Sequence, residues 1–312
     1  MIYLIIAILC GALFAVVFKI CQQHGISTSK VILYNYITGV LISWIPILID
    51  VCCSGGNTWT SYQLEPSSYL LAMIQGGFFT CGFLVMDTST YRSGVALTTA
   101  AARASLILPV ILSWAILSQN EPKWLPVILV LVALMFIIFP NEQQKHDPTQ
   151  YRSKSDAARR RKAAFALAGV FLFYGVSDFS MKIVQQQVVP SADDSCRLNA
   201  LTGTIFLMAA LISLAICIFS KPKPTKEQLA NKHPILSAII AGVILGAINL
   251  GCTSCMIRSL SELSTGVYYP IYNIGIVILS TIIGLAFFKE KIKWLQILGL
   301  IIAIIAILLF FA

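Results

Sequence analysis

Arg103 is the residue whose position in the sequence most clearly calls for a chemical role. It lies inside the apolar stretch Val95–Leu117, which is long enough to cross a membrane. A charge near the centre of such a helix costs about 2.5–3.5 kcal/mol on insertion scales, so it needs a partner or a function. Its planar guanidinium can donate to two oxygen atoms at once, which makes it a candidate anchor for a carboxylate or phosphate substrate. The alternative is a fixed ion pair with Asp178 or Asp87.

Four aromatic or polar residues lie close together around Pro270 in another apolar stretch. Tyr268 and Tyr272 are four residues apart, as are Tyr269 and Asn273, so each pair shares one face of a helix. One interpretation is a hydrogen-bonding, aromatic wall that binds a solute, with backbone carbonyls freed by Pro270 beside it. The other interpretation is an aromatic belt at the membrane surface. We predict that all four side chains bind substrate.

Asp178 lies four residues before Lys182, inside the apolar stretch Ala163–Val184. In one interpretation the two charges neutralise each other on one face of a helix. In the other, Asp178 couples transport to protons, because it is protonated alternately with substrate binding.

Other polar side chains of the apolar stretches carry weaker signals. Tyr174, Gln75 and Asn249 are further candidates for substrate binding. Asn35 and Asn199 precede a Thr and a Gly at the same spacing. Amides bond across helices and small residues permit close approach, so these two are predicted to pack helices.

The composition excludes an ordinary soluble domain. The chain has 312 residues, of which 58% are hydrophobic and 11% charged, and its mean hydropathy is +0.84. Soluble domains carry roughly 25% charged residues, so the lipid bilayer is the expected surrounding of this chain. The net charge of +9 comes from basic residues at helix ends and in connections, which indicates membrane topology and argues against a nucleic-acid partner.

No cofactor and no metal site is predicted. The three histidines fall in connections, and the nine cysteines lack the spacing of a disulfide framework. Cys252 and Cys255 have a CxxC spacing without a second ligand pair, inside an apolar stretch, and are predicted to pack between helices. The sequence has no phosphate-binding loop for ATP-driven transport.

The apolar stretches predict an all-α membrane protein of ten transmembrane helices, since about 20 apolar residues cross a bilayer. The polar stretch 141–162, which contains Arg159–Lys162, is predicted to be a basic cytoplasmic linker. The predicted helices are Ile2–Cys21, Val31–Ile49, Tyr69–Thr88, Val95–Leu117, Trp124–Pro140, Ala163–Val184, Leu198–Phe219, Ile235–Ile257, Gly266–Phe288 and Trp294–Phe311.

An internal repeat relates residues 1–140 to residues 163–312. Each half holds five predicted helices, an odd number, so the second half must enter the membrane from the opposite side. Two inverted five-helix repeats are the architecture of many secondary transporters. The matching pairs, in chain order, are Lys19–Gln23 with Lys182–Gln186, Asn35–Gly39 with Asn199–Gly203, Arg92–Ser93 with Arg258–Ser259, Leu97–Thr99 with Leu263–Thr265, and Glu121 and Trp124 with Glu290 and Trp294.

The distribution of Lys and Arg predicts an orientation. Most of these residues lie in the connections that follow odd-numbered helices, which include the 141–162 linker. The positive-inside rule then places the linker in the cytoplasm and both termini outside.

Residues near the helix ends carry a family resemblance. A Lys ends the first helix of each half and a Glu precedes the last, while the final helix contains a Gly in an apolar run. With these features the chain resembles the EamA-type members of the drug/metabolite transporter superfamily. The resemblance implies export or exchange of amino acids, sugars, nucleotide conjugates or drugs through a central cavity. Many such relatives keep both termini in the cytoplasm, unlike the orientation predicted here. The residues concerned are Lys19, Lys182, Glu121, Glu290 and Ile297–Ile301.

The predicted function is secondary active transport or export of a small polar or anionic metabolite by alternating access, in the plasma membrane of a bacterium. Two alternatives stay open, a lipophilic drug exporter and a membrane-embedded enzyme that acts on a lipid-linked substrate. Few acids and no histidine lie within the apolar stretches, which argues against the enzyme. The expected partners are a small-molecule substrate and the bilayer, with proton or ion coupling as the energy source. The sequence does not specify the substrate, the direction of transport or the oligomeric state.

Overall fold

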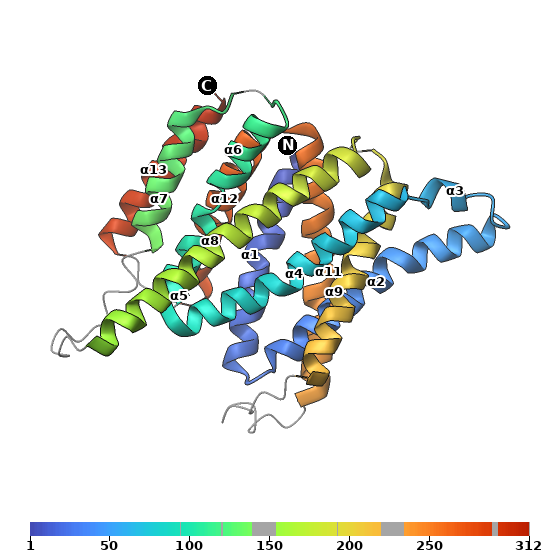
Figure 1. Cartoon of the computed structure of the whole chain (residues 1–312), viewed down its shortest axis with the longest axis horizontal. Coiled ribbons are helices and arrows are strands. Elements are labelled where there is room, and N and C mark those ends of the chain that lie inside the picture. Colours follow the sequence, from blue (N-terminus) through green and yellow to red (C-terminus); the bar gives the residue numbers. More distant parts are fainter. Residues whose placement is uncertain are drawn as a thin grey trace. The chain divides into compact units, whose positions relative to one another are not determined.

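The computed structural model describes residues 1–93, 95–119, 121–138, 154–191, 193–219, 234–288 and 293–311. Every regular element in these ranges is a helix (Figure 1), which confirms the all-α prediction for the described chain. The helices are α1 (Ile2–Gln23), α2 (Thr28–Cys53), α3 (Trp59–Tyr62), α4 (Pro66–Ser93), α5 (Val95–Ala104), α6 (Ile107–Ile116), α7 (Trp124–Ile138), α8 (Lys154–Val188), α9 (Ser195–Phe219), α11 (Pro234–Glu262), α12 (Thr265–Phe288) and α13 (Trp294–Phe311).

Eight helical segments of the described chain are long and apolar enough to cross a bilayer. Shorter apolar stretches lie in α1 (Ile2–Phe18) and α7 (Trp124–Ile137). Large hydrophobic side chains point outward along the spans, as Phe219 (85% exposed) and Phe165 (65% exposed) illustrate. Apolar exposure on this scale is favourable in lipid and unfavourable in water. The chain is therefore a multi-pass membrane protein, while the count of ten spans stays a prediction.

The start of α8 differs from the prediction. The helix begins at Lys154 rather than at Ala163, so the basic residues Arg159–Lys162 belong to it. Basic side chains are good helix formers, and the polarity of this stretch is compatible with a helix that extends out of the membrane. The remainder of the predicted linker and Glu290, which belongs to the repeat, lie outside the described residues.

The predicted helix Val95–Leu117 is divided into α5 and α6, and Pro109 explains the division. Proline has no N–H, so the Ser105 carbonyl cannot accept the usual bond from the residue four positions later. The Ser105 carbonyl instead accepts from the Leu108 N–H at 2.9 Å. The Arg103 carbonyl likewise accepts from Leu106 at 3.3 Å. Arg103 consequently lies in the last turn of α5, where the free carbonyls of a helix end favour a cation.

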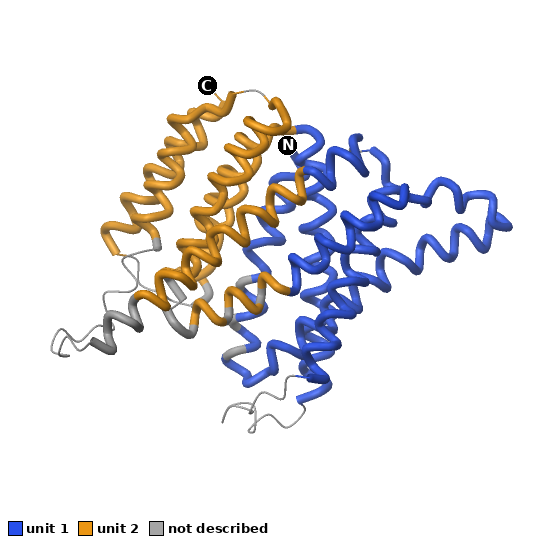
Figure 2. The backbone as a smooth tube through the Cα atoms, viewed as in Figure 1, with its two compact units in different colours: residues 1–80, 183–262 blue, residues 81–182, 263–312 orange. Residues whose placement is uncertain are grey.

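The described chain forms two compact units (Figure 2). Unit 1 consists of residues 1–80 and 183–262, and unit 2 of residues 81–182 and 263–312. The boundaries fall within α4, at the junction of α8 residues 182 and 183, and after α11. Each unit therefore combines segments from both halves of the sequence.

In unit 1, α2 and α9 pack against each other in opposite directions. The Cys217 thiol, near the end of α9, contacts the carbonyl of Ser29 near the start of α2 at 3.7 Å. Further along α2 and correspondingly earlier in α9, the hydroxyls of Ser43 and Thr202 lie 3.5 Å apart. Between these points Phe206 packs edge-on against Tyr36. Residue numbers therefore rise along α2 while they fall along the contacting positions of α9, so the two helices are antiparallel.

The second close helix pair of unit 1, α2 and α11, runs in parallel through two glycines of a GxxxG sequence. A Cβ atom added at Gly242 would collide with the Cβ of Tyr34. One added at Gly246 would lie 2.6 Å from both the carbonyl oxygen of Asn35 and the Cβ of Thr38. Small residues at this spacing let helix backbones approach in a membrane, where hydrophobic driving force between helices is absent.

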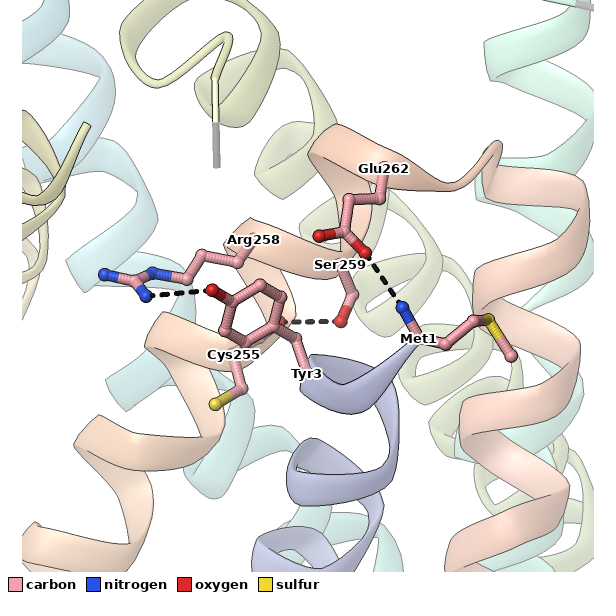
Figure 3. A network of polar contacts seen from close by, with 6 residues as sticks. All are labelled: Met1, Tyr3, Cys255, Arg258, Ser259 and Glu262. Atoms are coloured by element: carbon pink, nitrogen blue, oxygen red, sulfur yellow. Dashed lines mark hydrogen bonds and ion pairs between the residues drawn. The ribbon is translucent and has the colours of Figure 1, made fainter. Parts of the chain in front are cut away.

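One end of unit 1 holds a polar network around Arg258 of α11 (Figure 3). Its guanidinium donates to the Tyr3 hydroxyl of α1 at 3.3 Å and to the Ser195 hydroxyl of α9 at 2.9 Å. The Met1 amino group pairs with the Glu262 carboxylate at 2.8 Å. The starts of α1 and α9 and the end of α11 therefore lie together, as alternating helix directions require.

In unit 2, α7 and α13 also pack in opposite directions. The Lys123 ammonium, just before α7, donates to the Phe310 carbonyl near the end of α13 at 3.1 Å. At the other end of the pair, the Gln296 amide donates to the Ile137 carbonyl at 3.1 Å. Gly299 makes this approach possible, since a Cβ there would lie 2.9 Å from the Ala133 carbonyl oxygen.

Candidate functional site

Five of the residues predicted to bind substrate or protons belong to unit 2 and come from three helices. Arg103 is on α5, Tyr174 and Asp178 are on α8, and Tyr269 and Asn273 are on α12. Tyr174 and Asp178 are one turn apart, as are Tyr269 and Asn273, so each helix presents its pair on one face. Hydrogen bonds and electrostatic interactions join all five.

Arg103 makes a direct hydrogen bond to a neutral partner. Its Nη1 donates to Oδ1 of Asn273 at 3.0 Å, across 170 positions of the sequence. The Asn273 Nδ2 in turn donates to the Tyr269 carbonyl at 3.0 Å, which leaves the amide oxygen for Arg103. Asn273 is only 5% exposed. The amide of Asn273 orients the guanidinium but carries no charge that would neutralise it.

Asp178 is the acidic group of this cluster. Its carboxylate interacts electrostatically with Arg103, and Arg103 interacts in the same way with the Tyr174 hydroxyl. The backbone carbonyl of Asp178 accepts a hydrogen bond from the Tyr269 hydroxyl, which ties α8 to α12. Asp178 is thus one of the two acids considered as a partner of Arg103, while the side chain of Asp87 lies outside the described part.

The tyrosines of α12 form an aromatic cluster inside the unit. Tyr268 stacks on Tyr272 with ring centroids 5.3 Å apart. The rings of Tyr268 and Tyr269 meet edge-to-face, with centroids 5.1 Å apart. Tyr268 and Tyr269 are fully buried. A belt at the membrane surface requires rings that reach the lipid headgroups. Burial of these two rings argues against the belt, while a role of the tyrosines in substrate binding stays a prediction.

Gln119 also belongs to this region, although it was not among the candidate residues predicted from the sequence. Its Oε1 accepts hydrogen bonds from the Thr265 N–H at 3.1 Å and from the Thr265 hydroxyl at 2.8 Å. These contacts satisfy the start of α12, the helix that carries the tyrosines and Asn273. Thr265 belonged to a repeat match, but no local pattern links it to a glutamine 146 positions away.

Gln75 and Asn249, two further predicted binding residues, belong to unit 1. The Asn249 amide donates to Oδ1 of Asn35 at 3.2 Å, between α11 and α2. Asn35 is fully buried, as its predicted helix-packing role requires. Gln75 is also buried, at 1% exposure, on α4. A role of Gln75 and Asn249 in substrate binding stays a prediction.

The cysteines of the CxxC sequence are free thiols between helices. Cys252 donates to the Ala7 carbonyl of α1 at 3.6 Å, and Cys255 is half-buried. Within the described ranges no three His, Cys, Asp or Glu side chains are placed to hold a metal ion.

Comparison with known proteins relates the second half of this chain to a transporter family. Residues 161–312 match the model of the EamA-like transporter family. An uncharacterized protein of Haemophilus influenzae is 28% identical over 310 residues, which cover 97% of this chain and 95% of that protein. A solved structure described as the crystal structure of a protein has a TM-score of 0.67 and 11% identity, over 98% of this chain and 96% of that one. The structural similarity shows the fold alone. The match over residues 161–312 confirms the resemblance to EamA-type transporters that was drawn from the sequence.

Proposed function

We propose that the protein is a secondary active transporter or exporter of a small polar or anionic metabolite, with no enzymatic activity. The observation that carries the proposal is Arg103, a membrane-embedded cation whose direct hydrogen bond goes to the neutral amide of Asn273. A charged side chain inside the bilayer raises the free energy of insertion, so such residues usually have a functional role. A carboxylate or phosphate can accept two hydrogen bonds from the planar guanidinium at once.

Alternating access would follow from two inverted five-helix repeats, 1–140 and 163–312, with ten spans in all. The antiparallel packing of α2 with α9 and of α7 with α13 supports this arrangement. In each pair the two helices occupy the same position in the two proposed repeats, and inversion makes such partners run in opposite directions.

Each residue of the cluster has a proposed role. Arg103 anchors the anionic group, and the aromatic wall of Tyr268, Tyr269 and Tyr272 contacts the rest of the substrate, with Tyr174 beside it. Asp178 exchanges a proton as substrate binds, because its carboxylate interacts with Arg103, the residue that anchors the substrate.

Flux into proteoliposomes, guided by a thermal-shift screen, tests the proposal. The screen uses amino acids, sugars, organic acids, phosphorylated metabolites and lipophilic cations with the purified protein. A ligand at 100 times its dissociation constant stabilises the folded state by about 2.7 kcal/mol. We expect an anionic class to stabilise the protein and to be carried across the membrane, faster with a pH gradient.

Other outcomes of the screen separate the alternatives. Stabilisation and flux of lipophilic cations alone would replace the proposal with a drug exporter, in which the stacked pair Tyr268 and Tyr272 binds the cation. Binding without flux of any compound would contradict transport.

The proposed orientation has its own test. A reporter that is active only outside the cytoplasm, fused after Ala312, is expected to be active, because the positive-inside rule places the C-terminus outside. The same reporter inserted between residues 146 and 147, within the basic linker, should be silent. Activity in the linker and silence at the C-terminus would reverse the orientation.

A further inference from the structure

The cytoplasmic end of α8, in the proposed orientation, extends beyond the hydrocarbon core. The helix has 35 residues, or roughly 50 Å at 1.5 Å per residue, whereas the core is about 30 Å thick. The apolar residues of α8 that can cross the membrane begin at Ala163. The polar residues before them therefore lie at the level of the lipid headgroups and beyond.

Four consecutive basic residues occupy this level, Arg159, Arg160, Arg161 and Lys162, which we call the basic collar. Successive residues of an α-helix are about 100° apart, so four in a row surround the helix axis. Basic residues that only contacted other parts of the protein would lie on one face of α8. Four charges spread around the axis in this way cannot all face the rest of the protein.

The exposure of the collar and one contact with Phe165 indicate its depth. Arg161 and Lys162 are exposed, and the Arg161 guanidinium lies 5.6 Å from the ring centroid of Phe165. Phe165 is itself 65% exposed, one turn further into the apolar part of the helix. An exposed ring belongs in the acyl boundary, and an arginine stacked above it then lies at phosphate level.

We infer that the basic collar is a binding surface for anionic phospholipids of the inner leaflet. Each Lys or Arg next to a membrane gains from the negative headgroups, and four together select anionic over zwitterionic lipid. The exposed side chains of Arg161 and Lys162 give lipid phosphates access to the collar.

The test is lipid retention by the full-length protein, measured by native mass spectrometry from an equimolar mixture of dioleoylphosphatidylglycerol and dioleoylphosphatidylcholine. Wild type is expected to retain the anionic lipid over the zwitterionic one by roughly tenfold at 0.1 M salt. The preference should fall toward one at 1 M salt, where the screening length drops to about 3 Å. The variant with Arg159, Arg160, Arg161 and Lys162 all changed to Gln should show little preference at either salt concentration.

A matched control removes the same number of charges elsewhere. Lys221, Lys223, Lys226 and Lys232 lie in the connection that follows α9, on the same predicted side of the membrane. Changing all four to Gln should leave most of the preference intact. Equal loss in both variants would mean that total charge, and not the collar, selects the lipid. Absence of any preference in wild type would overturn the inference outright, and neither result depends on transport.

Discussion

Gly246→Val is expected to lower the midpoint of thermal unfolding by several degrees. The new side chain has no space, because even its Cβ would lie 2.6 Å from the Asn35 carbonyl oxygen and from the Cβ of Thr38. Both neighbours belong to the α2 backbone or are attached directly to it, so neither can rotate away. Overpacking costs about 1–3 kcal/mol where side chains adjust, and a forced separation of two helices lies at the upper end or above. A differential scanning measurement in detergent gives the shift.

Gly169→Val on α8 is the matched control. It places the same β-branched residue at a helical glycine of a membrane-spanning segment, but a Cβ there meets nothing within 4 Å. The helix-propensity change is therefore common to both variants, and the difference between them reports the packing of α11 on α2. Equal shifts in the two variants would contradict a close α2–α11 contact at Gly246.

Arg103→Ala is expected to remove the stabilisation produced by an anionic ligand. Loss of a charge-assisted partner in a desolvated site costs about 2–5 kcal/mol, which corresponds to at least a roughly 30-fold weaker affinity. Arg103→Lys keeps the charge but not the planar fork, so it should retain part of the affinity. Ligand-dependent thermal shifts, titrated for wild type and both variants, provide the comparison.

Arg258→Ala supplies the control for loss of an embedded arginine. Arg258 bonds Tyr3 and Ser195 at one end of unit 1, so its removal should destabilise the free protein. The ligand-induced shift should be unchanged in this variant, because no binding role is proposed for Arg258. If Arg103→Ala binds the ligand with wild-type affinity, Arg103 is not part of the site and its bond to Asn273 is structural.

The membrane class, the helical architecture and the choice of candidate residues follow from the amino-acid sequence alone. These conclusions depend on quantities that are local in the chain: the length of an apolar run, and the cost of a charge within it. Arg103, Asp178 and the tyrosines of α12 were found in this way. The ends of α8 were missed because polar residues are compatible both with a linker and with a helix in water.

Which of these side chains contact one another depends on how the helices pack in three dimensions. The bond of Arg103 to Asn273 and the bond of Gln119 to Thr265 join residues far apart in the chain. Spacing along one helix shows which residues share a face, but not how that helix is rotated against its neighbours. That rotation is set by close contacts such as Gly246 against Asn35, and by the break that Pro109 imposes before α6. Partners across helices therefore follow from packing, which no single segment of the sequence contains.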